Sequence, residues 1–249
     1  MLTKDQAICI RIVDYSETSQ IVTLFTKAGG KIDTIAKGAK RAKSPFDGPL
    51  EIFSCGNIVF SPPGEAKLAI LTEFQQTPSF SQLSKNLFAM NCALLAAELI
   101  NLMTIHYDPN PQLFDNFLQF LQNINKEQPA SSIRRNALSL SILFQLQLLR
   151  NVGLQPLLNA CGNCKTKFQL SWPEVYFSSS SHSLLCKDCS GSFPDRLKMP
   201  EKAANCLSNL KLIPDTDENT LRQIEKTLLY HFTELLHKPP KMAKHVLKT

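Results

Sequence analysis

The first third of the chain alternates apolar and polar positions with the period of β-strands. Ile8, Ile10 and Ile12 occupy every second position, as in a half-buried strand. Further strands are predicted over residues 21–26, 31–36, 50–60 and 67–74, separated by turns at 28–30 and 61–64 and a loop at 44–49. Five short strands with little room for a long helix between them predict a small barrel.

After Pro78 the apolar period changes to that of helices. One helical stripe runs through Phe88, Cys92, Leu95, Leu99 and Leu102, and others lie within residues 113–124 and 138–149. A last stripe runs from Leu221 to Leu235, and Asp217 is its predicted N-cap. The sequence therefore predicts an α+β protein, with a barrel over residues 1–78 and a helical domain over residues 79–249.

Two Cys-x-x-Cys pairs interrupt the helical part. Cys161 and Cys164 form the first pair, and Cys186 and Cys189 form the second. Zinc takes four thiolates in a tetrahedron, and each pair supplies two of them from one tight turn, which suits Gly162. We predict one structural zinc ion in a module over residues 157–195, with a polar turn at 178–182 between the pairs. Unligated thiols, a disulfide or a redox dithiol are the alternatives, and this spacing favours them less.

The net charge and the remaining cysteines give indications of the partner and the compartment of the protein. The formal net charge is +6, which is compatible with a polyanionic partner without proving one. The other four cysteines are not spaced in pairs: Cys9, Cys55, Cys92 and Cys206. Free thiols beside a four-cysteine site suggest a reducing compartment. The N-terminus reads as a strand and not as a signal peptide, and no segment has the length and apolarity of a membrane span. We expect a cytoplasmic protein.

The basic residues gather in one short run. Lys37, Lys40, Arg41 and Lys43 place four positive charges in seven residues at the end of a predicted strand, with no acid among them. Gly38 and small neighbours would let the backbone approach a phosphate closely. A solvated basic loop is the alternative, but a five-stranded barrel commonly binds single strands on one face. Arg134, Arg135 and the lysines of the C-terminal tail would extend this surface or simply be solvated.

Aromatic side chains would complete a site for single strands by stacking on bases. The candidates are Tyr15, Phe25, Phe46, Phe53 and Phe60. Because phenylalanine is usually buried, most of these are expected in the core.

No active site emerges from the sequence. Gly29 and Gly30 are not followed by the residues of a phosphate-binding loop, and the histidines are dispersed. His182, near the cysteines, would be an extra metal ligand only if a thiol were replaced. We expect a protein that is not an enzyme. A protein-interaction module with incidental nucleic-acid contact, and a zinc hydrolase or thiol oxidoreductase, remain the competing hypotheses.

Several of these segments resemble the RecO family of DNA repair and recombination mediators. The resemblance lies in residues 14–17, 21–26, Gly30 and most specifically 35–44. It continues through residues 144–149, Gly153, Pro156 and the two cysteine pairs. The order of barrel, helices, cysteine module and helices is similar over essentially the whole chain.

The resemblance implies an N-terminal OB-fold and a helical C-terminal domain stabilised by zinc on Cys161, Cys164, Cys186 and Cys189. It implies that Lys37, Lys40, Arg41 and Lys43 contact DNA. It also implies binding of single- and double-stranded DNA, annealing of complementary strands, and loading of the RecA recombinase together with RecR. The strands would be coated by single-strand-binding protein, whose acidic tail would dock in the helical domain. The protein would then be associated with the nucleoid.

Overall fold

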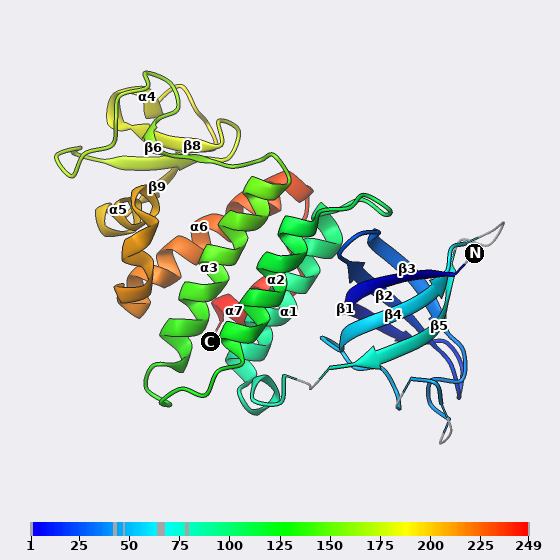
Figure 1. Ribbon diagram of the computed structural model, residues 1–249. Helices are drawn as coiled ribbons and strands as arrows, with labels where there is room; N and C mark the ends of the chain where they lie inside the picture. Colours follow the sequence, from blue (N-terminus) through cyan, green and yellow to red (C-terminus); the bar gives the residue numbers. More distant parts are fainter. Residues whose placement is uncertain (1, 42–43, 47, 64–67, 78–79, 249) are drawn as a thin grey trace. The chain divides into compact units, whose positions relative to one another are not determined.

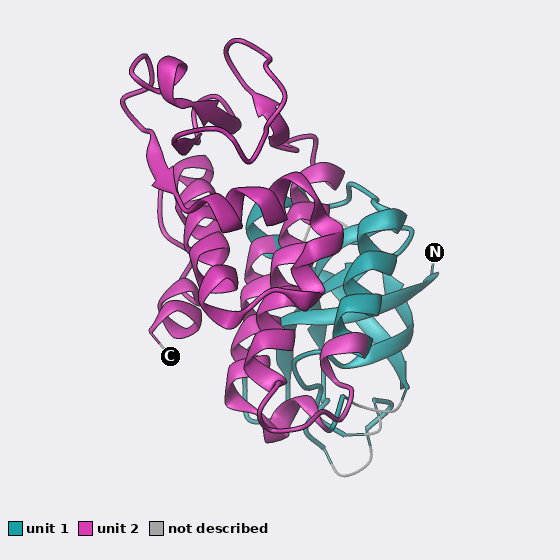
Figure 2. Cartoon of the chain, turned by 90° about the vertical axis from the view of Figure 1, so that its left-hand side faces the viewer, with its two compact units in different colours: residues 1–81, 100–122 teal, residues 82–99, 123–249 magenta. Residues whose placement is uncertain are grey.

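The computed structural model describes residues 2–41, 44–46, 48–63, 68–77 and 80–248. The chain forms two compact units (Figure 2). One comprises residues 1–81 and 100–122, and the other comprises residues 82–99 and 123–249. Residues 100–122 thus cluster with the N-terminal strands, although the sequence pattern grouped them with the later helices.

The N-terminal strands close into a barrel (Figure 1). Its strands are β1 (Thr3–Asp14), β2 (Gln20–Thr26), β3 (Gly30–Ala36), β4 (Cys55–Ser61) and β5 (Ala69–Gln76). Their order is β1-β2-β3-β5-β4, with β1 pairing with β4 to close the barrel and only β3 and β5 running parallel. The predicted five-stranded OB-fold barrel is confirmed.

The fourth strand is shorter than the sequence pattern predicts. Strand β4 begins at Cys55 and not at residue 50, so the prediction was wrong for residues 50–54. Phe53 has a left-handed backbone with φ of 66°, and the Ser54 amide donates to the Glu51 carbonyl across a turn. The side chain of Gln20 bonds both the amide and the carbonyl of Leu50 at 3.0 and 3.2 Å. Residues 53 and 54 still bond β1, since the Phe53 amide donates to the Cys9 carbonyl at 2.9 Å and the Cys9 amide to the Ser54 carbonyl at 2.8 Å, but the left-handed turn at Phe53 interrupts the regular strand.

The barrel is filled from alternate positions of its strands. On β1, Ala7 and Cys9 belong to the interior cluster, and a bulge between Cys9 and Arg11 brings Ile12 against it. Ile8 is also fully buried, but it pairs with Phe25 of β2, and cross-strand partners share a face. The outer face of this part of the barrel is therefore covered as well.

Residues 100–122 provide that cover. The ring of Phe114 in helix α2 (Pro111–Ile124) lies 6.1 Å from that of Phe25. Lys31 of β3 is buried, and its Nζ donates to the carbonyls of Asn101 and Thr104 at 2.6 and 2.7 Å. These carbonyls lie in and just beyond the last turn of α1 (Leu87–Met103), where they lack intrahelical partners.

The second unit is built on helices whose buried stripes match the predicted ones. Its longest helices, α3 (Ile133–Asn151) and α6 (Glu218–Leu236), lie side by side (Figure 1). Asp217 caps α6, since its carboxylate accepts the Thr220 amide at 2.9 Å, as predicted. The shorter helices are η1 (Leu83–Lys85), α5 (Glu201–Ser208), η2 (Leu210–Asp215) and α7 (Ala243–Leu247). None of the helices in the described part of the chain could cross a membrane.

A small sheet carries the cysteine pairs. It contains β6 (Leu157–Cys161), β8 (Ser183–Cys186), β7 (Val175–Ser178) and β9 (Leu197–Met199) in that order, with the short helix α4 (Lys187–Ser190) after β8. The predicted cysteine module is thus a four-stranded sheet set within an otherwise helical domain.

A buried carboxyl group lies between α3 and α6. Gln145 Nε2 donates to both carboxylate oxygens of Glu225 at 2.8 Å, while Gln145 Oε1 has no partner within the described part of the chain. Burial raises the pKa of Glu225 to about 7, against a smaller opposing effect of the Gln145 hydrogen bond. Turning the Gln145 amide over would let a protonated Glu225 donate to Oε1.

We therefore expect Glu225→Gln to stabilise the protein at neutral and alkaline pH. The pKa of Glu225 is raised on folding, so its contribution to stability is fully present below about pH 4.5 and is lost as pH rises through about 7. The loss amounts to roughly 3 kcal/mol, and the glutamine variant escapes it. Urea unfolding of both proteins between pH 5 and 8.5 checks this. A stability difference that does not change with pH would contradict it.

Candidate metal centre and nucleic-acid interface

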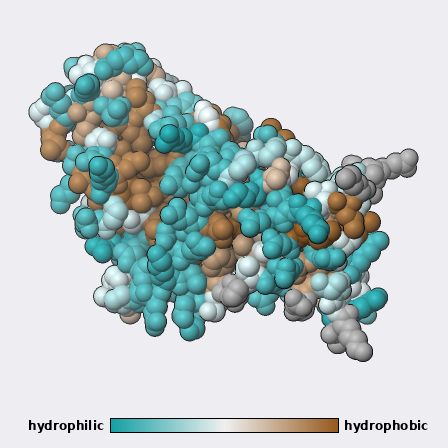
Figure 3. All heavy atoms as spheres, viewed as in Figure 1, coloured by the Kyte–Doolittle hydropathy of each residue, from teal (hydrophilic) through white to brown (hydrophobic). Residues whose placement is uncertain are grey.

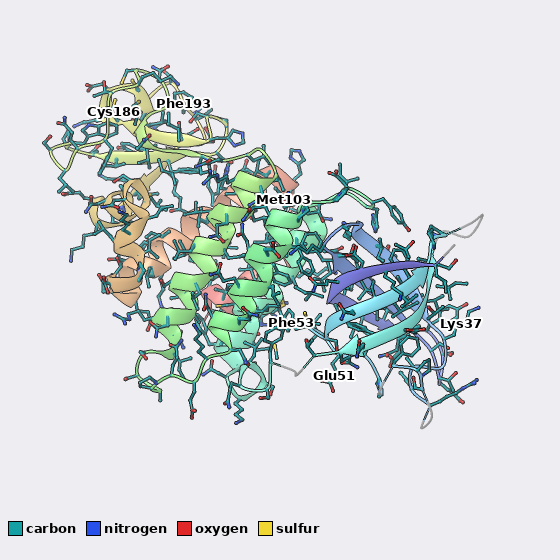
Figure 4. The ribbon with its side chains drawn as sticks, viewed as in Figure 1. Lys37, Glu51, Phe53, Met103, Cys186 and Phe193 are labelled. Carbon is teal, nitrogen blue, oxygen red and sulfur yellow. The ribbon has the colours of Figure 1, made fainter. Side chains whose placement is uncertain are left out.

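The four predicted cysteine ligands come together in space. The sulfur atoms of Cys161, Cys164, Cys186 and Cys189 all lie within 4.8 Å of one another. Cys161 ends β6 and Cys186 ends β8, and these two strands are paired in parallel. Cys164 follows in the turn beyond β6, and Cys189 lies in the short helix α4 beyond β8. Strand pairing therefore brings two sequence-distant Cys-x-x-Cys segments into one cluster. Figure 4 labels Cys186 in this part of the chain.

Close backbone packing shapes the first of these turns. A Cβ on Gly162 would lie 1.8 Å from Ser183 Oγ, so no side chain fits there. The Gly162 amide donates to the Leu184 carbonyl at 2.8 Å, which fastens the turn to β8. Glycine is thus required because β8 passes so close to the turn. The left-handed residue of the turn is Lys165, with φ of 62°.

The thiols differ in their surroundings. Cys161 is fully buried and Cys164 is exposed. Hydrogen bonds to the side chain and backbone of Thr166 lower the pKa of Cys164 to about 6, whereas burial raises the pKa of Cys186 to about 12. The four sulfur atoms lie close enough together to coordinate one ion tetrahedrally. Four sulfur donors suit a soft or borderline divalent cation, which would stabilise all four cysteines as thiolates. The arrangement can hold one metal ion.

The predicted polar turn between the cysteine pairs is the hairpin loop from β7 to β8. Asp195 accepts hydrogen bonds from the hydroxyls of Ser178 and Ser180 and from the Ser180 amide, at 2.8 to 3.0 Å. His182 lies in this loop, and its ring packs against that of His231 with centroids 5.1 Å apart. It does not belong to the cluster of four sulfurs.

The predicted basic run forms the turn that follows β3. Gly38 takes a left-handed φ of 72°, and the Arg41 amide donates to the Gly38 carbonyl. Two further bonds tie this turn to the β1–β2 loop, from the Gly38 amide to Ser19 Oγ and from the Lys40 amide to the Thr18 carbonyl. We call residues 37–41 the basic turn. It lies at one end of the barrel, where Figure 4 labels Lys37.

The cations of the basic turn are not equivalent. Lys37 and Arg41 are exposed. The Lys40 Nζ lies 2.6 Å from Asp14 Oδ1, in an ion pair whose carboxylate is largely exposed. An exposed pair of this kind is worth little energy, so a phosphate can compete for Lys40. Lys43 lies outside the described residues.

Tyr15 is the exposed member of the predicted stacking aromatics. Its side chain is 64% exposed, whereas Phe25, Phe46, Phe53 and Phe60 are at most 4% exposed and belong to the core. Tyr15 stands in the β1–β2 loop, whose residues bond the basic turn. One flat aromatic ring is therefore available beside the cations.

An apolar row on the outer face of the barrel was not predicted from the sequence. Val13 pairs with Ile21, Ile21 with Ile35, and Ile35 with Ile70, so the four side chains share one face across four strands. Val13 and Ile70 are 40% and 41% exposed, and the space-filling view shows apolar surface on the barrel (Figure 3). We call these four residues the apolar row. The apolar row can be recognised only from the strand register, because in the sequence each of its residues looks like a core residue.

The other basic residues considered from the sequence have structural partners or lie elsewhere. Arg134 bonds Glu218 at 3.3 Å and lies 4.6 Å above the ring of Phe88. Arg135 bonds Asn136 at 3.4 Å. Of the lysines of the tail, Lys241, Lys244 and Lys248 line a groove of the second unit together with residues of α6 and α7.

Two family models match the chain and together span nearly all of it. The model described as "Recombination protein O N terminal" matches residues 1–80, and that described as "Recombination protein O C terminal" matches residues 84–244. The first match covers the barrel strands and the basic turn. The second covers the helical domain and all four cysteines of the cluster.

Curated relatives agree with this assignment. The chain is 32% identical over 216 residues to "DNA repair protein RecO" of Rhodopirellula baltica, covering 86% of this chain and 77% of that protein. It is 30% identical over 207 residues to the protein of that name from Bacillus subtilis, covering 83% and 76% of the two chains. The Bacillus pumilus protein of the same name is 28% identical over 242 residues, covering 94% and 89%. With the closed barrel and the four-cysteine cluster, these matches show that the chain belongs to the RecO family of DNA repair proteins.

Proposed function

We propose that this protein acts in homologous recombination by binding single- and double-stranded DNA and annealing complementary strands. The observation that carries the proposal is the basic turn on the barrel of a RecO family chain, where Lys37, Lys40 and Arg41 gather. With Lys43, these residues are the proposed DNA contacts. The protein would act by binding alone, without catalysing a covalent step.

Phosphate neutralisation supplies the physical basis. Two complementary strands repel each other through their phosphates, and cations that neutralise both backbones lower this repulsion. Because Gly38 has no side chain, phosphate oxygens can approach the backbone of the basic turn closely, while the amides of Lys40 and Arg41 are already bonded within the barrel. Contacts of this kind do not depend on base sequence, so base pairing between the two strands supplies the specificity.

The uncharged part of the proposed site, Tyr15 and the apolar row, favours the unpaired bases of single strands. Tyr15 offers a ring on which a base can stack, and the apolar row offers contact for the faces of neighbouring bases. A duplex hides these faces, whereas a single strand presents them. We therefore assign phosphate contact to the basic turn and base contact to Tyr15 and the apolar row.

The two parts of the chain would divide the work. In this proposal residues 1–78 are the nucleic-acid-binding domain, and residues 79–249 are a helical domain that the module at 157–195 stabilises. The metal is one structural zinc ion on Cys161, Cys164, Cys186 and Cys189, because four cysteine ligands leave no open position for a substrate or water. Bound zinc would cross-link the two turns of the module and keep its small sheet folded.

The proposed partners follow from family membership. Together with RecR, the protein would help to load the RecA recombinase on strands coated by single-strand-binding protein. The acidic C-terminal tail of that coating protein would dock on the helical domain. A protein with these partners would work in the cytoplasm, on the nucleoid.

Strand annealing tests the proposal directly. Annealing of complementary oligonucleotides, naked and coated by single-strand-binding protein, should be fast for the wild type and slowed at least tenfold when Lys37, Lys40, Arg41 and Lys43 are replaced by alanine. Lys85, Lys167, Lys202 and Lys211 are exposed lysines of the second unit, and their replacement removes the same charge as a control. Equal annealing by both variants would exclude the basic turn. Failure of the wild type to anneal naked strands would favour a protein-interaction module with incidental nucleic-acid contact.

A further inference from the structure

A hollow lies on the outer face of the barrel, where β1, β4 and β5 run side by side (Figure 1). Its volume is about 820 Å³, which is enough for one small ligand. The turn at Lys27 and Ala28 and the first residue of α2, Pro111, line one side of it. That turn joins the ends of β2 and β3 that lie away from the basic turn. The hollow is therefore separate from the basic turn.

Three side-chain amides lie across the floor of the hollow. Gln6 pairs with Asn57 and Asn57 with Gln75, so the three side chains share the outer face in one row across β1, β4 and β5. We call these three residues the amide row. All three are exposed, and their side chains have no hydrogen-bond partner in the described part of the chain. Because each amide holds a donor and an acceptor side by side, the row can bind a ligand edge that also combines the two.

The neighbouring row of the same strands carries opposite charges at its two ends. Lys4 pairs with Val59 and Val59 with Glu73, two positions along from the amide row. Lys4 and Glu73 are exposed, and neither forms an ion pair with any of the described residues. The spacing of three adjacent strands places them about 10 Å apart. The hollow thus offers a free cation on β1 and a free carboxylate on β5.

The other two charged residues that line the hollow are engaged in holding its wall. Asp5 Oδ2 accepts the amides of Ala28 and Gly29 at 3.0 and 2.8 Å, which fixes the turn between β2 and β3. Lys27 Nζ lies 2.8 Å from Asp115 Oδ1 and so ties this turn to α2. The wall is therefore in place before any ligand arrives.

We propose that this hollow binds one nucleotide with an unpaired base, either free or as a residue of a single strand. Asparagine and glutamine amides pair with base edges through two hydrogen bonds, so the base lies on the amide row. Lys4 binds the phosphate, and Glu73 accepts a hydrogen bond from a sugar hydroxyl. A peptide backbone also bonds amides, but it carries neither a phosphate nor sugar hydroxyls. The site goes beyond the proposed function, which places base contacts at Tyr15 and the apolar row.

Titration calorimetry of the full chain with adenosine monophosphate tests the inference. We expect submillimolar binding that weakens at least about tenfold in Asn57→Ala/Gln75→Ala, because two amides that pair with the base are lost. Lys4→Gln should weaken it about fivefold through loss of the phosphate contact. The matched variant Gln119→Ala/Gln122→Ala removes exposed amides of α2 outside the hollow and should bind like the wild type. All these side chains are exposed, and circular dichroism checks that each variant is folded.

Changes in the ligand test the same contacts on the unmodified protein. Adenosine, which lacks the phosphate, and ribose phosphate, which lacks the base, should each bind at least about fivefold more weakly. Lys4→Gln should bind adenosine and adenosine monophosphate alike. A trimer of deoxyadenylate distinguishes the sources: if only the trimer depends on the amide row, the hollow takes a residue of a strand, and if the monophosphate does, it takes the free nucleotide.

Three results would overturn the inference. One is equal binding of both ligands by the wild type and by Asn57→Ala/Gln75→Ala. Another is absence of binding of both ligands by the wild type. The third is binding of a neutral triglycine peptide that depends on the amide row, which would favour a peptide site. Annealing is scored separately with the variant of the basic turn, so either proposal can fail alone.

Discussion

Replacing Cys161 with serine is expected to abolish binding of the proposed metal ion and to unfold residues 157–195. Cys161 is the fully buried ligand at the end of β6, and its sulfur joins the two cysteine turns. Binding of structural zinc by small domains is worth about 10–16 kcal/mol, and most of that is folding energy. The sheet has only four strands of three to five residues, so we expect it to depend on the metal more than the longer helices do. Metal analysis and amide hydrogen exchange of the purified variant measure both effects.

The same variant tests the division between metal and DNA binding. We expect its barrel to stay folded and to bind DNA with affinity within about threefold of the wild type, a free-energy change below about 0.7 kcal/mol. Cys55→Ser, which changes a thiol of the barrel outside the cluster, is the matched control and should keep the metal. Loss of DNA binding in a Cys161→Ser protein whose barrel is intact would refute this division. Full retention of metal would refute the ligand assignment.

Replacing Lys37, Lys40, Arg41 and Lys43 with alanine is expected to flatten the salt dependence of DNA binding. Each phosphate contact contributes about 0.9 to the slope of log affinity against log salt for duplex DNA and about 0.7 for single strands. Loss of four contacts should therefore reduce the slope by about 3.6 and about 2.8, respectively. Titrations of both DNA forms between 50 and 300 mM salt, conditions chosen to span about half a decade or more, measure the slopes.

A change at Tyr15 should behave differently. Tyr15→Ala removes an uncharged stacking contact, so we expect single-strand affinity to fall by about 1–3 kcal/mol while the salt slope stays the same. Duplex affinity should change little, because duplex bases are already stacked on one another. An unchanged slope in the four-residue variant would remove the basic turn from the DNA site. A changed slope in Tyr15→Ala would show that its effect is not stacking.

Much of the secondary structure and the set of clustered cysteines could be predicted because they depend on nearby residues. The helical stripe from Leu221 through Ile224 and Leu228 to Phe232 repeats over several turns, and the structure buries it along its length. Each Cys-x-x-Cys motif is confined to four consecutive residues, so its spacing is visible in the sequence. Asp217 caps α6 through a bond to Thr220 only three positions away. In each case the chemistry is local, and packing elsewhere in the chain does not alter it.

Other features could not be predicted because distant segments create them. Residues 50–54 have the apolar character of a strand, but bonds from the Gln20 side chain to Leu50 and the left-handed backbone of Phe53 delay the start of that strand to Cys55. Residues 100–122 follow a helical pattern, yet Phe114 packs on Phe25 and the carbonyls at the end of α1 bind Lys31. The ion pair of Lys40 with Asp14 likewise joins residues that are far apart in the sequence.

The sequence by itself determined the order of barrel, helices and cysteine module, the four cysteines that cluster and the position of the basic turn. These features depend on residue type and periodicity within short segments, so they can be recognised from a few neighbouring positions. Only the tertiary structure decided which side chains share a surface. The apolar row depends on the register of four strands, Tyr15 joins the basic turn through loop contacts, and the lysine-rimmed groove needs α6 and the tail to pack together. Such surfaces form when segments that are far apart in the sequence pack side by side. The local sequence pattern does not predict which segments become neighbours.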